Sequence, residues 1–379
     1  MMTNEEFYAA SNLRENPFRS NPVSDSDVRR GVWVGYSKER ETLTKLLKRS
    51  LANEVGSGNM VMIYGELGVG KSHALLWAQY QILQAQKDVF KGAAYYVQSL
   101  VGNKGKMSFK EAFVQAILEK SDMLHDILRF RQFVEERIVL FKGENGLGHD
   151  ESWEKVAAKL IPSMEMINVL RKILKCENEA AVREFLNPGT DHEAMQLFCR
   201  IVNLFVYPFV LNSGTKQFKS AVYLFIDELD ELGNVSAKEA REVNLLLRHI
   251  YDLCPRCFFI GLGFTASAAE LGVLFANYIT DRANKTIVLE FFQPDEGREF
   301  VKQILNTARI DIKKKCDYFP FAEEAIITIV SQIVSITPRK IVQRMQQIIE
   351  ECRLAGIDPS KEPITTEMLD KYKIWETLD

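Results

Sequence analysis

The sequence feature that most constrains this chain is a glycine-rich turn between an apolar run and a helical pattern. Residues 61–72 read VMIYGELGVGKS, in which Gly65, Gly70, Lys71 and Ser72 fit the phosphate-loop pattern G-x-x-x-x-G-K-[ST]. The glycines let the backbone turn tightly and point its N–H groups inward, and a helix that begins at Lys71 adds the positive end of its dipole. The pattern therefore predicts a strand, a phosphate-binding loop and a helix that together bind a nucleotide.

Each position of this loop has an expected role. The Lys71 side chain should reach the β- and γ-phosphates of ATP, and the Ser72 hydroxyl should hold Mg²⁺. The backbone around them should surround the phosphates, so the predicted ATP-binding residues of the loop are Gly65, Glu66, Leu67, Gly68, Val69, Gly70, Lys71, Ser72 and His73.

An acidic pair follows a second apolar run. Residues 221–226 read AVYLFI and lead directly into Asp227 and Glu228. Because ligands bind at the carboxyl ends of buried parallel strands, Asp227 should hold Mg²⁺ through water and Glu228 should activate the attacking water. Alone, the run also fits a strand end with a solvated acidic tail, since Asp230 and Glu231 follow. Together with the phosphate loop it predicts ATP hydrolysis.

Apolar runs alternate with helical patterns along the first three quarters of the chain, and only helical patterns follow. This order predicts an α/β fold, a three-layer parallel sheet with an all-helical lid after it. Ser108 and Glu111 form a capping-box pattern at the start of one helix. The expected strands are 61–64, 92–97, 221–226, 257–262 and 287–291, and residues 121–215 are largely helical by pattern.

Composition limits the partners and the compartment. The net charge is −3, so any nucleic-acid contact requires a local basic patch. The N-terminus has no signal-peptide pattern, and the most apolar run, residues 197–211, is too short for a membrane span and predicts a buried helix. Six cysteines indicate reduced thiols, so we expect a cytoplasmic protein that does not enter a membrane.

Several segments resemble one family. Residues 225–232, FIDELDEL, resemble the D-E-h-D-x-L signature of AAA+ ATPases of the initiator type, which include origin-recognition ATPases and the transposition-regulator ATPases of Tn7-like elements. Residues 258–265 are similar to the sensor 1 strand, residues 287–294 to the strand that leads into the lid, and residues 335–340, SITPRK, to the start of the sensor 2 helix. The family has fewer residues before the acidic pair, so the resemblance identifies about 121–215 as a helical insertion.

The resemblance implies roles for further residues. Arg339 would reach the γ-phosphate from the lid, and Thr265 would be sensor 1, with Phe264 as the alternative. Arg282 would be the arginine finger presented to a neighbouring subunit, with Lys285 as the alternative; an ordinary surface arginine is the competing interpretation.

The resemblance also implies a domain layout. It places an N-terminal lead-in at 1–30, an α/β nucleotide-binding domain at 31–292 and a helical lid at 293–379. Val34 and Gly35, with residues 16–18, would surround the adenine. The lid pattern leaves no room for the winged-helix domain of origin-recognition ATPases, which makes the layout closer to that of the transposition regulators.

Two functions remain open from the sequence. The first is a homo-oligomeric ATP-hydrolysing switch with ATP at the subunit interfaces, which acts on double-stranded DNA in replication, transposition or defence against mobile DNA. Lys104 and Lys106 lie in the region where relatives face DNA, although a solvated basic loop explains them equally well. The second is a nucleotide-gated module with slow hydrolysis, whose insertion at 121–215 binds a protein partner and which has no DNA role.

Overall fold

The computed structural model describes residues 3–19, 28–148, 150–161, 163–267, 270–311 and 317–377. It divides into two compact units, which we call the sheet unit (Glu39–Tyr64 and Ala74–Val288) and the lid unit (Met1–Lys38, Gly65–His73 and Leu289–Asp379). Residues 1–2 and 20–27 of the predicted lead-in lie outside the described residues. The domain bounds expected from the sequence stay a prediction.

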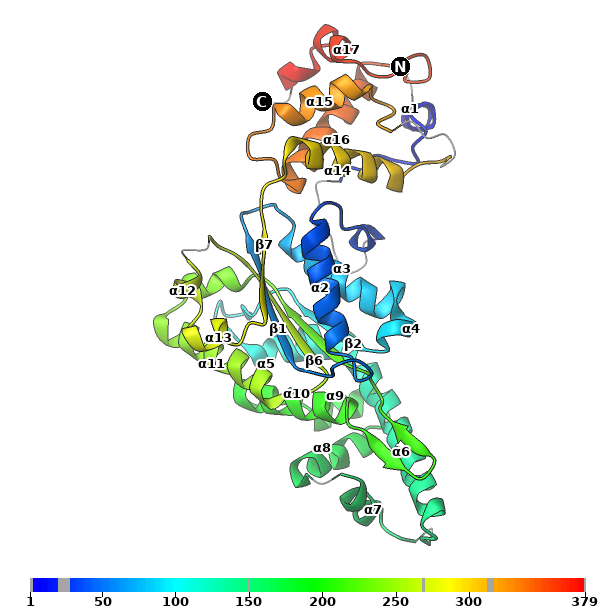
Figure 1. Cartoon of the computed structure of the whole chain (residues 1–379), viewed down its shortest axis with the longest axis vertical. Helices are drawn as coiled ribbons and strands as arrows, with labels where there is room; N and C mark the ends of the chain where they lie inside the picture. The colour runs from blue at the N-terminus through cyan, green and yellow to red at the C-terminus, as the bar shows by residue number, and fades with distance from the viewer. Residues whose placement is uncertain are drawn as a thin grey trace. The chain divides into compact units, whose positions relative to one another are not determined.

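A five-stranded parallel sheet forms the centre of the sheet unit (Figure 1). Strands β2 and β5 and strands β5 and β6 pair in parallel, and the side chains of β1, β2 and β5 are buried along their whole length. Burial of both faces explains why these strands read as continuous apolar runs. The strands lie in the order β2 (Ala93–Val97), β5 (Val222–Ile226), β6 (Phe258–Thr265), β1 (Asn59–Gly65) and β7 (Lys285–Leu289).

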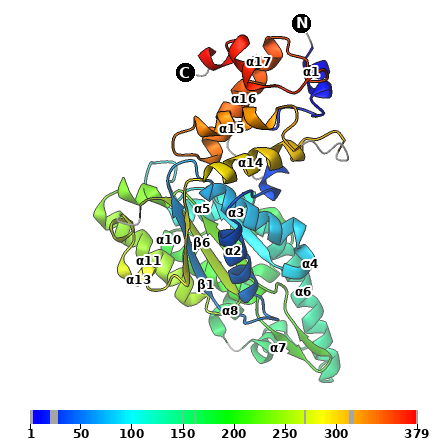
Figure 2. The same cartoon turned by 45° about the horizontal axis from the view of Figure 1, so that its top comes forward.

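Helices cover both faces of this sheet, so the predicted three-layer α/β class is confirmed. On one face the Tyr223 hydroxyl donates to the Leu47 carbonyl of α2 (Ser37–Arg49) at 3.0 Å. On the other face, Phe198 of α10 (Asp191–Phe205) packs edge-on against Tyr95 and Phe258. Figure 2 shows α2 and α10 on opposite sides of β6.

Outside residues 121–215, the remaining helical elements of the sheet unit are short, apart from α11. Ser108 caps α5 as predicted, but the Glu111 carboxylate accepts from the Asn103 N–H at 2.8 Å, so only half of the expected capping box forms. These elements are α3 (Lys71–Tyr80, whose first residues belong to the lid unit), η2 (Gln81–Ala85), α4 (Lys87–Phe90), α5 (Phe109–Ala112), η3 (Phe113–Lys120), η4 (Leu229–Gly233), α11 (Ala237–Leu253), α12 (Leu271–Leu274) and α13 (Asn277–Thr280).

The region from 121 to 215 is helical as predicted except at its end. Helices α6 (Met123–Glu144), α7 (Trp153–Leu160), α8 (Met164–Leu174) and α9 (Glu179–Phe185) precede α10. A hairpin of β3 (Phe209–Leu211) and β4 (Gly214–Lys216) follows, where the sequence predicted helix. The Glu144 carboxylate accepts both N–H groups of the hairpin turn, from Asn212 at 2.7 Å and Ser213 at 2.9 Å, and so fixes the turn on α6.

The lid unit is built from helices around its own apolar core. The N-terminal segment belongs to this core, because Phe7 and Phe18 are fully buried and Leu13 forms an antiparallel bridge with Arg309. No described helix of the protein is long and apolar enough to cross a membrane. The helical elements are α1 (Asn4–Ala10), η1 (Val28–Gly31), α14 (Pro294–Thr307), α15 (Glu323–Ser331), α16 (Pro338–Leu354), α17 (Thr366–Lys371) and η5 (Ile374–Thr377).

Candidate active site

The phosphate loop connects β1 to α3, as the sequence predicted. The Lys71 ammonium is buried and donates to the Gly65 carbonyl at 2.9 Å and the Glu66 carbonyl at 2.8 Å. Gly65 is required because a Cβ there would lie 2.2 Å from the Leu289 carbonyl oxygen. Gly70 has a φ of +103°, which a residue with a Cβ rarely adopts. The loop therefore holds its cation in place, and the Ser72 side chain beside it is exposed.

The start of α16 lies against this loop within the lid unit. The Arg339 N–H donates to the Gly68 carbonyl at 3.3 Å, and a Cβ on Gly68 would lie 3.1 Å from the Arg339 Cβ. Thr337 caps the helix by accepting from the Lys340 N–H. The Arg339 side chain is exposed and makes no ion pair with any residue that the structure describes. The residue expected to sense the γ-phosphate is therefore adjacent to the loop.

The segment predicted to surround the adenine is also fixed in the lid unit. Val34 is buried, and Gly35 has a φ of +72° and packs so closely that a Cβ would lie 2.7 Å from the Phe292 ring. The Tyr36 hydroxyl donates to the Glu290 carbonyl at 2.6 Å. The His73 Nε2 lies 2.8 Å from the Val32 carbonyl oxygen, which links this segment to the first turn of α3.

The acidic pair lies at the end of β5 in the sheet unit. Asp227 is 3% exposed, and its Oδ2 accepts a hydrogen bond from the Tyr96 hydroxyl at 2.9 Å. Its Oδ1 accepts from the Glu228 N–H at 3.0 Å, and a Cβ on Gly263 would lie 2.6 Å from this oxygen. The carboxylate is thus held in one orientation by two donors and by close packing. Carboxylate oxygens are among the ligands that Mg²⁺ prefers, so Asp227 has the chemistry to hold it.

Glu228 differs from its neighbour because its side chain reaches solvent and is only partly buried. Its backbone is left-handed, with a φ of +52°, so the chain turns as it leaves the strand. Gln98 Nε2 donates to Glu228 Oε1 at 3.3 Å. Partial burial of the carboxylate, with smaller effects of the charges on Asp227, Asp230 and Glu231, raises the Glu228 pKa above its ordinary value of 4.5, and the Gln98 hydrogen bond opposes this rise.

The structure separates the two sensor 1 candidates. Thr265 ends β6, is partly exposed, and its N–H donates to Asp230 Oδ1 at 3.0 Å. Phe264 is fully buried, with its ring centroid 5.7 Å from Tyr64 and 4.8 Å from Phe275. Phe264 is therefore a core residue, and Thr265 is the candidate with a polar group at the strand end.

The arginine-finger candidate is engaged inside its own chain. The Arg282 guanidinium forms two hydrogen bonds with the Asp252 carboxylate, at 2.8 Å and 3.1 Å, and a third with the Tyr278 carbonyl. The Arg282 hydrogen bonds lower the Asp252 pKa, and the same pair raises the Arg282 pKa. Lys285, the alternative, is exposed at the start of β7.

Lys104 and Lys106 are exposed in a loop that closes on itself through the Val101–Met107 bridge, and neither forms an ion pair with the described residues. The loop also contains Gly105, whose φ is +68°.

Two residues at the acidic pair were not predicted. Gln98 follows a buried strand directly, and a polar side chain at that place is a signal that could have indicated it. Tyr96 lies within an apolar run that gives no such signal.

No family model matches the sequence, and no curated protein matches it. Solved structures do match its fold. A structure of the ORC2 protein of Aeropyrum pernix, determined as ADPNP–ADP complexes, has 13% identity and a TM-score of 0.52 over 93% of this chain and 72% of that one. A structure of Drosophila ORC bound to DNA has 12% identity and a TM-score of 0.51 over 100% of this chain and 67% of that one. The protein therefore shares its overall fold with these two ORC structures.

Proposed function

We propose that this protein is an ATP-binding and ATP-hydrolysing oligomeric switch that acts on double-stranded DNA. One observation carries the proposal. In the parallel sheet, β6 lies between β5 and β1, the acidic pair directly follows β5, Thr265 ends β6 and the phosphate loop directly follows β1. Because ligands bind at the carboxyl ends of such strands, the order of the strands supports a single nucleotide site.

In this proposal each residue has one task. The Lys71 ammonium exchanges its two loop carbonyls for oxygens of the β- and γ-phosphates. Ser72 and Asp227 hold Mg²⁺, which neutralises phosphate charge when it is bound. Glu228 accepts the proton of the attacking water. The remaining contacts to the γ-phosphate come from Thr265 and Arg339.

Hydrolysis in the proposed switch requires a second copy of the chain. A neighbouring subunit presents Arg282 to the phosphates, so the site is complete only in the homo-oligomer. In the single chain, Asp252 forms an ion pair with the Arg282 guanidinium and orients it. Assembly must therefore replace this ion pair with contacts to the phosphates of the neighbouring subunit.

The Drosophila ORC structure of similar fold is bound to DNA, which supports testing duplex DNA as the partner. Lys104 and Lys106 offer two exposed charges in a loop with glycine at two positions.

Fluorescence anisotropy with a labelled duplex, with and without ATP at about 50 mM salt, tests this role. We expect ATP-dependent binding that weakens as salt rises. The Lys104→Ala/Lys106→Ala double variant should lower the affinity for all duplexes and flatten the salt dependence by up to roughly two units per engaged subunit. The charge-matched control Lys45→Ala/Lys48→Ala, on the exposed side of α2, should bind like wild type.

The cavity at the surface of the insertion favours the alternative, a nucleotide-gated module that binds a protein. This cavity has a volume of about 430 Å³ and is lined by four apolar side chains and four charged ones, namely Ile138, Val139, Trp153, Leu174, Glu135, Glu154, Arg171 and Lys175. Buried aromatic and aliphatic side chains are typical anchors of protein interfaces. Under this alternative, duplex DNA gives no ATP-dependent signal at low salt, and removal of the insertion abolishes function.

A further inference from the structure

Two adjacent tyrosines of β2 each donate a hydrogen bond to a buried carboxylate. The Tyr96 hydroxyl lies 2.9 Å from Asp227 Oδ2, and the Tyr95 hydroxyl lies 3.0 Å from Asp126 Oδ2. Successive side chains of a strand point to opposite faces of the sheet. Strand β2 therefore contacts the acidic pair on one face and the first turn of α6, the long helix of the insertion, on the other.

Side chains on the face of β2 that carries Tyr96 donate hydrogen bonds to both carboxylates of the acidic pair. Gln98 is two residues further along, so it projects from the same face and donates to Glu228. Strands β2 and β5 are paired directly, with Tyr96 opposite Phe225, and the Asp227 N–H donates to the Val97 carbonyl at 2.9 Å. The orientation of the acidic pair therefore depends on the position of β2.

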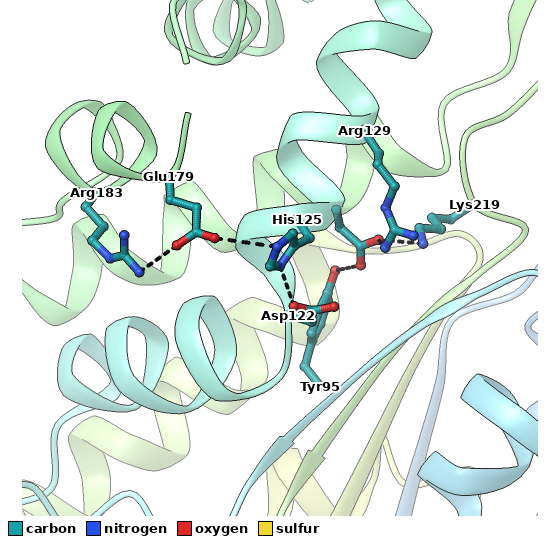
Figure 3. A network of polar contacts seen from close by, with 8 residues as sticks. Tyr95, Asp122, His125, Arg129, Glu179, Arg183 and Lys219 are labelled. Carbon is teal, nitrogen blue, oxygen red and sulfur yellow. Dashed lines mark hydrogen bonds and ion pairs between the residues drawn. The ribbon is translucent and has the colours of Figure 1, made fainter. Parts of the chain in front are cut away.

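The opposite face holds the insertion through a charged cluster around the buried Asp126 (Figure 3). Asp126 is almost fully buried and forms ion pairs with Arg129 at 2.8 Å and Lys219 at 2.6 Å. Tyr95 is fully buried, and this burial together with the Asp126 charge raises its pKa well above 10, so its hydroxyl remains a donor. This hydrogen bond joins β2 to α6.

The segment that leads into α6 is also fixed to the backbone of β2, through the side chain of Ser121. Ser121 Oγ accepts from the Tyr96 N–H at 3.1 Å and donates to the Tyr96 carbonyl at 3.3 Å. Further out, His125 lies between Asp122 and Glu179, and Glu179 pairs with Arg183 (Figure 3). These outer groups are exposed and add little, so the connection rests on Tyr95, Tyr96 and Ser121.

We propose that β2 couples the acidic pair to the helical insertion, with Tyr96 as a positioning residue for Asp227 and Tyr95 as the connection to α6. This inference rests on the proposed ATPase function. Asp227 accepts the hydrogen bond of the Tyr96 hydroxyl and is also the residue expected to hold Mg²⁺. Mg²⁺ binding at Asp227 and the hydrogen bond from Tyr96 should therefore affect each other. A change at Asp227 then reaches the insertion through β2.

Removal of single hydroxyl groups tests the positioning role, because phenylalanine keeps the buried ring. The affinity for ATP is measured by calorimetry with Mg²⁺ and with EDTA. Tyr96→Phe should reduce the gain in affinity that Mg²⁺ provides about tenfold, which is about 1.4 kcal/mol, and should leave the affinity in EDTA unchanged. The control Tyr223→Phe removes a buried hydroxyl that donates only to the Leu47 carbonyl, and it should retain the full gain.

Hydrogen–deuterium exchange of residues 123–130 tests the coupling to the insertion. We expect ATP with Mg²⁺ to change exchange in wild type, and Tyr95→Phe to bind ATP normally while losing this response. The inference is overturned if Tyr96→Phe keeps the full Mg²⁺ gain, if Tyr223→Phe loses it equally, or if nucleotide leaves exchange in wild-type α6 unchanged. A wild-type protein that binds no ATP would refute the proposed function itself, which is a different result.

Discussion

Gly263→Ala disturbs the acidic pair without removing any polar group. Gly263 lies in β6, and an added Cβ would lie 2.6 Å from Asp227 Oδ1 and 2.8 Å from Leu75 Cδ1. Both contacts are too short to exist, so the Asp227 carboxylate must move away from its two donors. Overpacking a buried site costs about 1–3 kcal/mol, and loss of a hydrogen bond to a charged group costs about as much again. We therefore expect the free energy of unfolding to fall by about 2–6 kcal/mol.

The consequence for the site is measured separately from stability. Urea unfolding gives the loss of stability, and calorimetry at a temperature where the variant is folded gives the affinity for ATP with Mg²⁺ and with EDTA. The gain from Mg²⁺ should fall at least tenfold, about 1.4 kcal/mol. Gly272→Ala is the matched control, because its Cβ meets no atom within 4 Å and should change stability by less than about 1 kcal/mol. A folded Gly263→Ala protein with wild-type stability and the full Mg²⁺ gain would refute this description of Asp227.

Two further predictions concern hydrolysis. Glu228 must be ionised to accept a proton, so turnover should be lost as pH falls through its raised pKa. Gln98→Leu removes the hydrogen bond that lowers this pKa, so the acidic limb of the kcat profile should move to higher pH. If the limb does not move, it reports the ionisation of another group. Arg282→Ala and Glu228→Gln should each be nearly inactive alone. Mixtures should recover phosphate release, because the first variant supplies Glu228 and the second supplies Arg282 at a mixed interface. Mixed assemblies without recovery would mean that hydrolysis is not shared between subunits.

The sheet and the phosphate loop could be predicted because their signals are local. Strands buried on both faces read as unbroken apolar runs, and the loop needs glycine at fixed positions for reasons now visible at Gly65 and Gly70. The hairpin after α10 was missed because its first strand, Phe209–Leu211, continues the apolar run of the helix, and its turn is fixed by Glu144, which lies far away in the sequence.

The contacts of the acidic pair could not be predicted for a related reason. Tyr96 meets Asp227 only because β2 and β5 pair in the register that sets Tyr96 opposite Phe225. That register joins strands separated in sequence by residues 98–221, and neither strand shows a pattern that fixes it. Similarly, Glu111 could cap its own helix or bind Asn103, and the fold of the preceding loop decides between them.

Titration of ATP with Mg²⁺ into wild type, Lys71→Ala and Glu228→Gln tests the central claim most directly. The Lys71 ammonium is the buried cation of the phosphate loop, so Lys71→Ala should lose at least tenfold in affinity, about 1.4 kcal/mol. Glu228→Gln keeps its size and hydrogen bonding and should bind ATP as tightly as wild type. A Lys71→Ala protein that binds ATP within about threefold of wild type would contradict the assignment of this loop as the nucleotide site.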